Sequence, residues 1–295
     1  MRFDYPLVVL AALASLPACS SPSAAGVEAS GGDAAMSAGG ETAGRPSVTR
    51  CPEGPRPTTD TQIVGVGFVQ GQIVDENGDP ASAGLVQVCG KNICINANVD
   101  DSGRLGQAID QQMDAPACKY GDGLAFGKLA LPIGGGDSDL GTLTTVRLPT
   151  FDAGVPLTPG TTVTSAGVSL TLSVDAKVEI DALTYETEVE GGFRAALLPP
   201  DALAKLDQGF ALGLALAPVE TRICPSPSLT IVNSADLAAG TELELYILGL
   251  DVLEEWAPYA GWQKVGEGRV SDDGATLEFP DGVPLLTAIG IREKP

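Results

Sequence analysis

The chain has 295 residues, 44% of them hydrophobic, and carries 17 Lys and Arg residues against 38 Asp and Glu residues, a net charge of −21. Binding to nucleic acid or to an anionic membrane surface requires clustered basic residues, so this balance argues against both partners. No histidine is present, which excludes Ser–His–Asp and Cys–His catalytic sites and the H-E-x-x-H zinc site. Carboxylate or lysine chemistry would remain for an enzyme, and the sequence implies no cofactor or metal.

Residues 1–18 have the pattern of a secretory signal peptide. A positive charge at Arg2 precedes an apolar run, residues 7–14, that is too short to span a bilayer. The stretch Leu16-Pro17-Ala18-Cys19 resembles the lipobox of bacterial lipoproteins. That resemblance implies acylation of Cys19, a membrane attachment through the N-terminal lipid, and a location in the outer membrane or at the cell surface. An ordinary signal peptide followed by an unrelated cysteine is the alternative.

Residues 19–60 are predicted to form a flexible tether. They are rich in Ser, Ala, Gly and Pro and show no apolar alternation, so they bury too little surface to offset the entropy of ordering the chain. A flexible coil of roughly thirty residues spans about 30 Å. The tether would therefore hold the folded part away from the lipid headgroups.

The rest of the chain favours an all-β fold with two β-sandwich domains, residues 61–150 and 151–295. Helical periodicity is scarce, whereas short alternating runs and turn residues are common, with 37 Gly and 22 Pro. In the first domain, strands are expected at 68–74, 85–89 and 93–99, with a turn at 77–78 before the second strand and another at 100–103 after the third.

Parity predicts a disulfide between Cys89 and Cys94. If these two residues lie opposite each other in a hairpin, Val88 faces Ile95 on one side of the sheet, and polar residues and both cysteines share the other. A directly opposed, non-hydrogen-bonded pair has the Cα spacing that a disulfide tolerates. A register shift of one residue would destroy these matches.

The remaining cysteines allow no comparable argument. If Cys19 is acylated, Cys51, Cys118 and Cys224 are left in an exported, disulfide-permissive compartment. Cys118 is the expected partner of Cys51 because both are assigned to the first domain. Cys224, next to a proline in the second domain, is the expected free thiol.

Residues 71–80, 83–88 and 99–105 carry a recognisable pattern. The first stretch reads G-x-I-x-D-x-x-G-x-P, with Ile73 at a position where the family pattern has Val. A strand follows, and the last stretch reads D-x-x-G-x and then an aliphatic residue. This order resembles the carboxypeptidase regulatory-like (transthyretin-like) β-sandwich. The resemblance implies a non-catalytic sandwich of the kind appended to secreted bacterial proteins.

In the second domain, alternation predicts strands, and one short helix is expected at 201–206 after two prolines. The three glutamates Glu186, Glu188 and Glu190 are predicted to alternate along one strand, as a solvated edge. From residue 229 onward, the order of strands and turns resembles the β-sandwich shared by ankyrins and netrin receptors. The apolar run 210–218 is too short to cross a membrane. The strands are expected at 163–172, 229–232 and 242–247.

Two motifs have alternative interpretations. Asp75, Asn77 and Asp79 imitate the start of a calcium loop, but the twelfth position is Val86, so an ordinary Asx turn is favoured over calcium binding. The G-x-G pairs at 65–67 and 266–268 do not open a helix, so strand-edge glycines are favoured over nucleotide binding.

Rare aromatic residues cluster at residues 256–262. Trp256 and Tyr259, beside carboxylates, are the candidate ligand-binding residues, because flat rings and acceptors suit a sugar. The alternative is that the aromatics are structural, with Trp262 as a core anchor entering a strand.

These features predict a non-catalytic, surface-displayed lipoprotein. It would act as a binding or structural module of the bacterial envelope, with a polysaccharide or an envelope protein as partner. The alternative is a carboxylate-dependent hydrolase of extracellular glycans, which needs two carboxylates facing across a cleft, one of them with a raised pKa.

Overall fold

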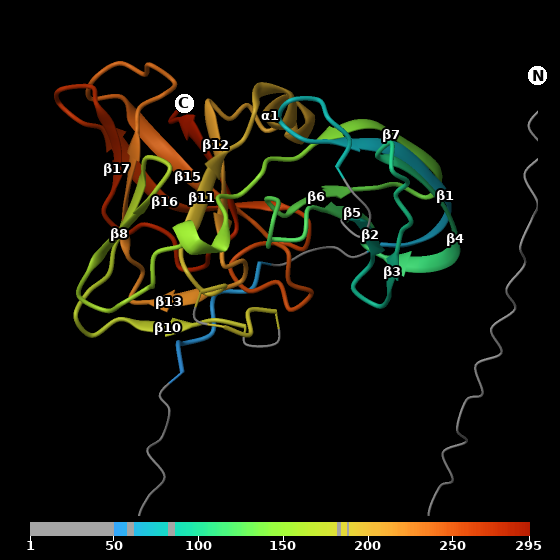
Figure 1. Cartoon of the computed structure of the whole chain (residues 1–295), viewed down its shortest axis with the longest axis horizontal. Coiled ribbons are helices and arrows are strands. Elements are labelled where there is room, and N and C mark those ends of the chain that lie inside the picture. Colours follow the sequence, from blue (N-terminus) through green and yellow to red (C-terminus); the bar gives the residue numbers. More distant parts are fainter. Residues whose placement is uncertain (1–49, 58–61, 82–85, 182–183, 188) are drawn as a thin grey trace, which may run out of the picture. The chain divides into compact units, whose positions relative to one another are not determined.

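The computed structural model confirms the all-β prediction (Figure 1). The described residues lie in one compact unit, Val48–Pro295. The predicted signal peptide, Cys19 and most of the predicted tether lie outside them. No helix of the described residues is long and apolar enough to cross a membrane. The structure describes residues 50–57, 62–81, 86–181, 184–187 and 189–295.

Seven strands precede residue 150. They are β1 (Ile63–Val74), β2 (Val86–Cys89), β3 (Cys94–Asn96), β4 (Arg104–Asp114), β5 (Ala117–Tyr120), β6 (Leu129–Pro132) and β7 (Gly136–Thr144). They form a three-stranded sheet, β4-β1-β7, and a four-stranded sheet, β3-β2-β5-β6. Strand β1 pairs antiparallel with β4 and parallel with β7.

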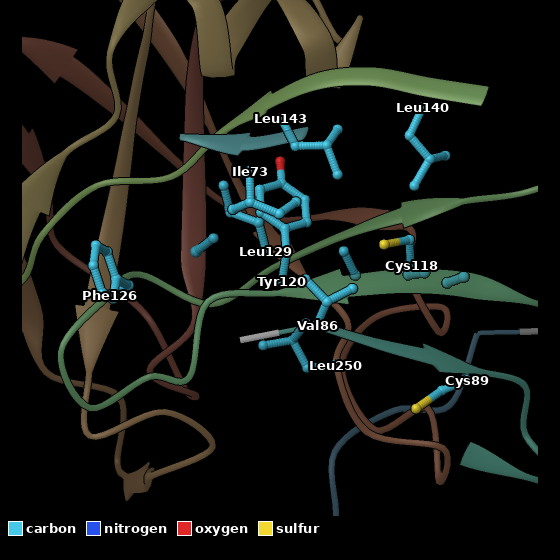
Figure 2. Packing of buried hydrophobic residues seen from close by; sticks show 14 of the residues in the cluster. Ile73, Val86, Cys89, Cys118, Tyr120, Phe126, Leu129, Leu140, Leu143 and Leu250 are labelled. Atoms are coloured by element: carbon cyan, nitrogen blue, oxygen red, sulfur yellow. The ribbon is translucent and has the colours of Figure 1, made fainter. Parts of the chain in front are cut away.

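The side chains between these two sheets form one hydrophobic cluster (Figure 2). Ile73 and Leu143 come from the three-stranded sheet, and Val86, Tyr120 and Leu129 come from the other side. All five are at most 1% exposed, which is the packing expected of a sandwich core.

The later strands follow a short 3₁₀ turn, Phe151–Ala153. Helix α1 (Pro200–Leu206) confirms the helix predicted at 201–206 and has a proline at its first turn, where the missing N–H is not needed. The strands are β8 (Thr162–Ser165), β9 (Val168–Thr171), β10 (Lys177–Glu179), β11 (Arg194–Leu197), β12 (Leu212–Ala217), β13 (Arg222–Cys224), β14 (Ser228–Val232), β15 (Glu242–Leu248), β16 (Trp262–Val270), β17 (Thr276–Phe279) and β18 (Ala288–Glu293).

Nine of these strands form one curled sheet in the order β11-β12-β18-β15-β16-β17-β14-β9-β8. Its edge strands meet where the Ala195 N–H of β11 donates to Ser165 Oγ of β8 at 3.0 Å. The inner face is a second hydrophobic cluster that includes Leu214, Leu245 and Phe279. The nearly closed sheet therefore has an apolar interior and an outward face that is open to polar side chains.

Strand β12 explains the apolar run at residues 210–218. Leu214 and Leu216 point into the curled sheet, whereas Ala215 and Ala217 belong to the cluster of the first seven strands. A Cβ on Gly127 would lie 2.5 Å from the Ala215 Cβ, so small residues are required where the backbones approach. The hydrophobic core thus continues across residue 150, and the predicted domain division at that position stays a prediction.

Two Asx turns brace β1, as the sequence predicted. Asp75 Oδ1 accepts the N–H groups of Asn77 and Asp79 at 2.9 and 3.0 Å, and Asp100 Oδ1 does the same for Ser102 and Arg104 at 2.9 Å each. The carbonyl oxygen of Gly103, in the second turn, accepts the N–H of Ile73 in β1 at 2.7 Å. Gly103 has φ +76°, and a Cβ there would lie 2.3 Å from the Ile73 oxygen, so only glycine fits.

The cysteine predictions are half right. The register Gln87↔Asn96, Val88↔Ile95, Cys89↔Cys94 and the disulfide Cys89–Cys94 are those predicted.

The other pairing was wrong: Cys51 bonds to Cys224, and Cys118 is the free thiol. Cys118 faces the sandwich core on β5, out of reach of Cys51, and burial raises the pKa of its thiol to about 12.

The strand predicted over the glutamates at 186–190 was also wrong. Glu186 and Glu190 lie in irregular chain, and Glu188 is outside the described residues. Glu190 Oε2 accepts the Thr187 N–H at 3.0 Å and the Thr187 hydroxyl at 3.1 Å, which closes a local turn that competes with strand pairing.

Candidate functional site

The predicted aromatic site lies on the loop between β15 and β16. The loop is closed by backbone hydrogen bonds from Gly249 N–H to the Gly261 oxygen, 2.9 Å, and from Ala260 N–H to the Gly249 oxygen, 2.8 Å. Glu254, Trp256 and Ala260 have positive φ. Such tight folding fixes the direction of each side chain, so the loop is a rigid structure and its aromatics cannot reorient freely.

Tyr259 does not fit the ligand-binding role. Its side chain is only 6% exposed, its hydroxyl donates to the Cys89 oxygen at 3.3 Å, and Lys119 Nζ lies 4.7 Å from its ring centre. Burial raises the pKa of Tyr259 and lowers that of Lys119 to about 8. Tyr259 therefore joins the loop to the first sandwich, and its ring offers no open face for stacking.

Trp256 lies under the segment that precedes β1. We call residues Arg50–Pro57 the strap. The backbone N–H of Trp256 donates to the Pro55 carbonyl oxygen at 2.9 Å. A Cβ on Gly54 would lie 2.3 Å from the indole nitrogen of Trp256. The indole is thus packed against the strap backbone, with hollows of about 270 and 150 Å³ on its flanks.

The strap is fastened by covalent and ionic contacts. Cys51 is bonded to Cys224, and its N–H donates to Glu179 Oε1 at 2.6 Å. Glu255 lies 2.7 Å from Arg222 and 3.9 Å from Arg56. Sequence reasoning missed the strap because nothing local in residues 50–57 indicates what they contact.

Trp262 agrees in part with its predicted role as an anchor. It is partly buried against the first hydrophobic cluster and packs edge-on against Phe210, with ring centres 4.8 Å apart. A Cβ on Gly290 would lie 2.4 Å from the Phe210 ring, so that ring sits directly on the β18 backbone. This contact is not predictable from local sequence patterns because Phe210 and Trp262 are far apart along the chain.

A groove of about 630 Å³ crosses the outward face of the curled sheet. One row of residues runs straight across four neighbouring strands: Glu242 pairs with Arg269, Arg269 with Glu278, and Glu278 with Thr230. Gly268, beside this row, pairs with Leu243, and the Phe279 ring of the inner cluster packs where its side chain would be. We call this surface the charged groove; Glu267 and Lys294 also line it.

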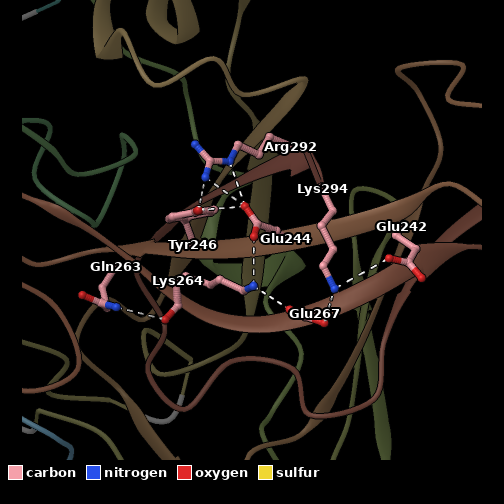
Figure 3. Close-up of polar contacts among 8 residues, drawn as sticks. All are labelled: Glu242, Glu244, Tyr246, Gln263, Lys264, Glu267, Arg292 and Lys294. Atoms are coloured by element: carbon pink, nitrogen blue, oxygen red, sulfur yellow. Dashed lines mark hydrogen bonds and ion pairs between the residues drawn. The ribbon is translucent and has the colours of Figure 1, made fainter.

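The charges beside the groove are paired with one another (Figure 3). Lys264 and Arg292 form ion pairs with Glu244, at 2.9 Å each. Glu267 forms ion pairs with Lys264 at 2.6 Å and with Lys294 at 3.0 Å. Hydrogen bonds from Lys264, then from Tyr246 and Arg292, lower the pKa of Glu244 to about 2.

Glu267 is held in the same way, and its pKa is also lowered, first by Lys264 and then by Lys294. A general acid for glycoside hydrolysis needs a carboxyl whose pKa is raised. Glu244 and Glu267 are shifted in the opposite direction, so the network stabilises ionised carboxylates.

Asp75 of the calcium-like motif makes its contacts with other groups of the protein. Asp75 is 2% exposed, and its Oδ2 lies 3.0 Å from the Arg147 guanidinium. Burial raises the pKa of Asp75, but the N–H groups of Asn77 and Asp79 and the Arg147 charge outweigh it, and the pKa lies below its usual range. Within the part of the chain that the structure describes, no group of three or more Cys, Asp or Glu residues is placed to hold a metal ion.

Similarity to known proteins is found among solved structures. No family model and no curated protein matches the chain. A DUF3823 family protein from Bacteroides ovatus has 9% identity, covering 78% of this chain and 91% of that chain, with a TM-score of 0.20. A DUF3823 family protein from Parabacteroides merdae has 9% identity, covering 76% and 98%, with a TM-score of 0.21.

The Bacillus anthracis TIE protein has 10% identity, covering 78% of this chain and 49% of that chain, with a TM-score of 0.22. Such low identities and TM-scores do not support a transfer of function. The functional conclusion therefore rests on the residues of this chain.

Proposed function

We propose that this chain is a non-catalytic lipoprotein of the bacterial outer membrane or cell surface, acting as a binding or structural module of the envelope. Acylation at Cys19 would attach it, and the tether would separate the folded part from the lipid. Its partner is a polysaccharide or an envelope protein. The signal-like pattern of residues 1–18 and the position of Cys19 support the attachment.

The single observation that supports binding over catalysis is the ion-paired outward face of the curled sheet. Glu244 and Glu267 each contact two basic side chains, and their pKa values are lowered. Carboxylates fixed in mutual ion pairs suit a structural face of the module, and their lowered pKa values keep them ionised. The hydrolase alternative needs the reverse electrostatics, a carboxyl kept protonated at neutral pH.

The family resemblance supports the same function. The motif residues Asp75 and Asp100 each cap a turn that braces β1, and Gly103 is required by its contact with Ile73. We propose that residues 61–150 form a carboxypeptidase regulatory-like sandwich, a domain that is non-catalytic in that family.

Attachment is tested by expressing the full chain beside its Cys19→Ser variant and partitioning each between detergent and buffer. The wild type is expected in the detergent phase, because stable anchoring needs more than one acyl chain at about 0.8 kcal/mol per buried methylene. The variant is expected in the buffer or unprocessed. An unmodified mature N-terminus at another residue contradicts the lipoprotein proposal.

Function is tested by incubating the full-length chain with envelope polysaccharides and envelope extract, and by measuring retention and the release of reducing ends together. Retention without release is the expected result. Release that disappears in Glu278→Gln would instead establish the hydrolase alternative, because Glu278 lines the groove and forms no ion pair with the residues that the structure describes.

A further inference from the structure

The outward face of the three-stranded sheet β4-β1-β7 differs from the charged groove. A shallow depression of about 350 Å³ lies on it. The polar side chains that surround the depression, together with one aromatic ring next to it, make up what we call the glutamine face: Phe68, Gln70, Gln72, Arg104, Asp139 and Thr142.

Strand register places these side chains in rows. Gln70 lies between Asp139 of β7 and Gly106 of β4, and Gln72 lies between Thr142 and Arg104. Backbone forms the floor at Gly71, which alternates with the outward Gln70 and Gln72, and at Gly141, which carries no side chain. A Cβ on Gly71 would lie 2.9 Å from the Gly141 oxygen, and Gly141 has φ +59° at a register shift between β1 and β7. The depression is therefore built into the pairing of the strands.

The polar groups are fixed in place before any ligand arrives. Gln70 Nε2 donates to Asp139 Oδ2 at 3.0 Å, and Asp139 Oδ1 accepts the Gly141 N–H at 2.9 Å. These two bonds, with the Gly141 bond first, hold the pKa of Asp139 below its usual range. Because the amide and the carboxylate already share one geometry, a ligand would order few side chains on binding.

Phe68 supplies an apolar surface next to these groups. Its side chain is 40% exposed on a strand, and its ring tip lies 3.5 Å from where a Cβ on Gly106 would be. Its N–H donates to Asp137 Oδ1 at 2.8 Å, a contact that requires glycine at 67, where a Cβ would lie 2.4 Å from the same oxygen. The ring is thus held over glycine backbone, with the rest of its surface open to solvent.

We propose that the glutamine face binds a neutral polysaccharide. Sugar hydroxyls both donate and accept hydrogen bonds, and the amides of Gln70 and Gln72, the carboxylate of Asp139 and the guanidinium of Arg104 supply both kinds of partner on one surface. The Phe68 ring suits the apolar C–H face of a sugar ring. This inference rests on the proposed function and names the class of partner and its site.

Charge and composition select this occupant. The exposed carboxylates Asp137 and Asp139, in a chain of net charge −21, repel anionic glycans and nucleic acids. A stable protein interface has an apolar, aromatic-rich centre, whereas Phe68 is the one large apolar side chain among the six residues of the glutamine face. The other exposed apolar residue of β1, Ile63, lies at the start of the strand. A hydroxyl-rich, uncharged polymer lying along a flat sheet is the ligand that matches both observations.

The test is retention of the full-length chain, in detergent, on insoluble mannan, xylan and β-glucan, with polygalacturonate as the anionic comparison. Wild type is expected on at least one neutral polymer. Phe68→Ala and Gln70→Ala are expected to weaken retention about tenfold or more, equivalent to about 1.4 kcal/mol. Val232→Ala is the matched control, an apolar side chain 54% exposed on a strand of the other sheet, and should change nothing.

Four results overturn the inference. If Phe68→Ala and Gln70→Ala are retained as strongly as wild type, the ligand binds elsewhere and the proposed function stands. Retention on polygalacturonate alone reverses the charge argument. Capture of an envelope protein with no retention on any neutral polymer removes the polysaccharide but keeps the binding module. If neither polysaccharide nor envelope protein is retained, the proposed function fails as well. Melting curves of both variants must match wild type, which their exposed positions predict.

Discussion

The two halves of the described chain are held together by different bonds and present different outward sheet faces. Strands β1–β7 are closed by a local disulfide, Cys89–Cys94, and two Asx turns, and their outward sheet face presents amides over a glycine floor. Strands β8–β18 are fastened by a disulfide between residues 173 apart, and their outward face is a network of ion pairs. The second face pairs its charged groups with one another, whereas the first keeps hydrogen-bonded amides and a carboxylate exposed beside an aromatic ring.

The largest effect is expected from the disulfides. Replacing Cys51 and Cys224 by Ser should lower the free energy of unfolding by about 5 kcal/mol, because the bond closes a long loop in the unfolded chain. Replacing Cys89 and Cys94 should cost about 2 kcal/mol, because their loop is short. Urea unfolding of both double variants measures the difference. Equal losses would contradict the view that the two halves are fastened by bonds of different reach.

Two turn glycines give the next contrast. Gly103→Ala should lower the free energy of unfolding by about 3 kcal/mol or more, because the new Cβ would lie 2.3 Å from the Ile73 oxygen and φ is +76°. Gly78→Ala is the matched control: φ is +82°, but no atom lies within 4 Å of its Cβ position, so about 1 kcal/mol is expected. A similar loss in both variants would show that the second turn does not brace β1.

Acid stability separates the two faces more subtly. The pKa of Glu244 is about 2 in the folded chain and 4.5 ordinarily, so its contribution is fully present above pH 4.5 and is lost as the pH falls toward about 2. Glu244→Gln should flatten the pH dependence of the melting temperature in that interval. Asp139→Asn, on the glutamine face, should flatten it less, because fewer charged groups hold that carboxylate. Parallel curves for wild type and Glu244→Gln would show that the ion pairs do not contribute.

The parts predictable from the sequence are those fixed by local chemistry. Alternation gave the strands around residues 68–74 and 242–247, parity gave the Cys89–Cys94 register, and a proline pair gave the helix at 201–206. Each depends on residues close together along the chain, so short-range geometry determines it.

The errors come from contacts between distant segments. Cys224 reaches Cys51, and Tyr259 reaches Cys89 and Lys119, only because strands far apart in sequence fold together. The aromatic loop was correctly seen as unusual, but its rings are used for packing against the strap and the first sandwich. The glutamine face escaped notice because single Gln and Asp residues on alternating strands gather only through the parallel pairing of β1 with β7.

The most direct test of the account is hydroxyl-radical footprinting of the full-length chain with and without the neutral polysaccharide that retains it. Oxidation at Phe68 should fall when the polysaccharide is added, while oxidation at Trp256, Trp262 and Val232 stays constant. That result would place the ligand on the glutamine face and leave the ion-paired face structural. Protection confined to the strands of the charged groove, with Phe68 oxidised as before, would contradict the account.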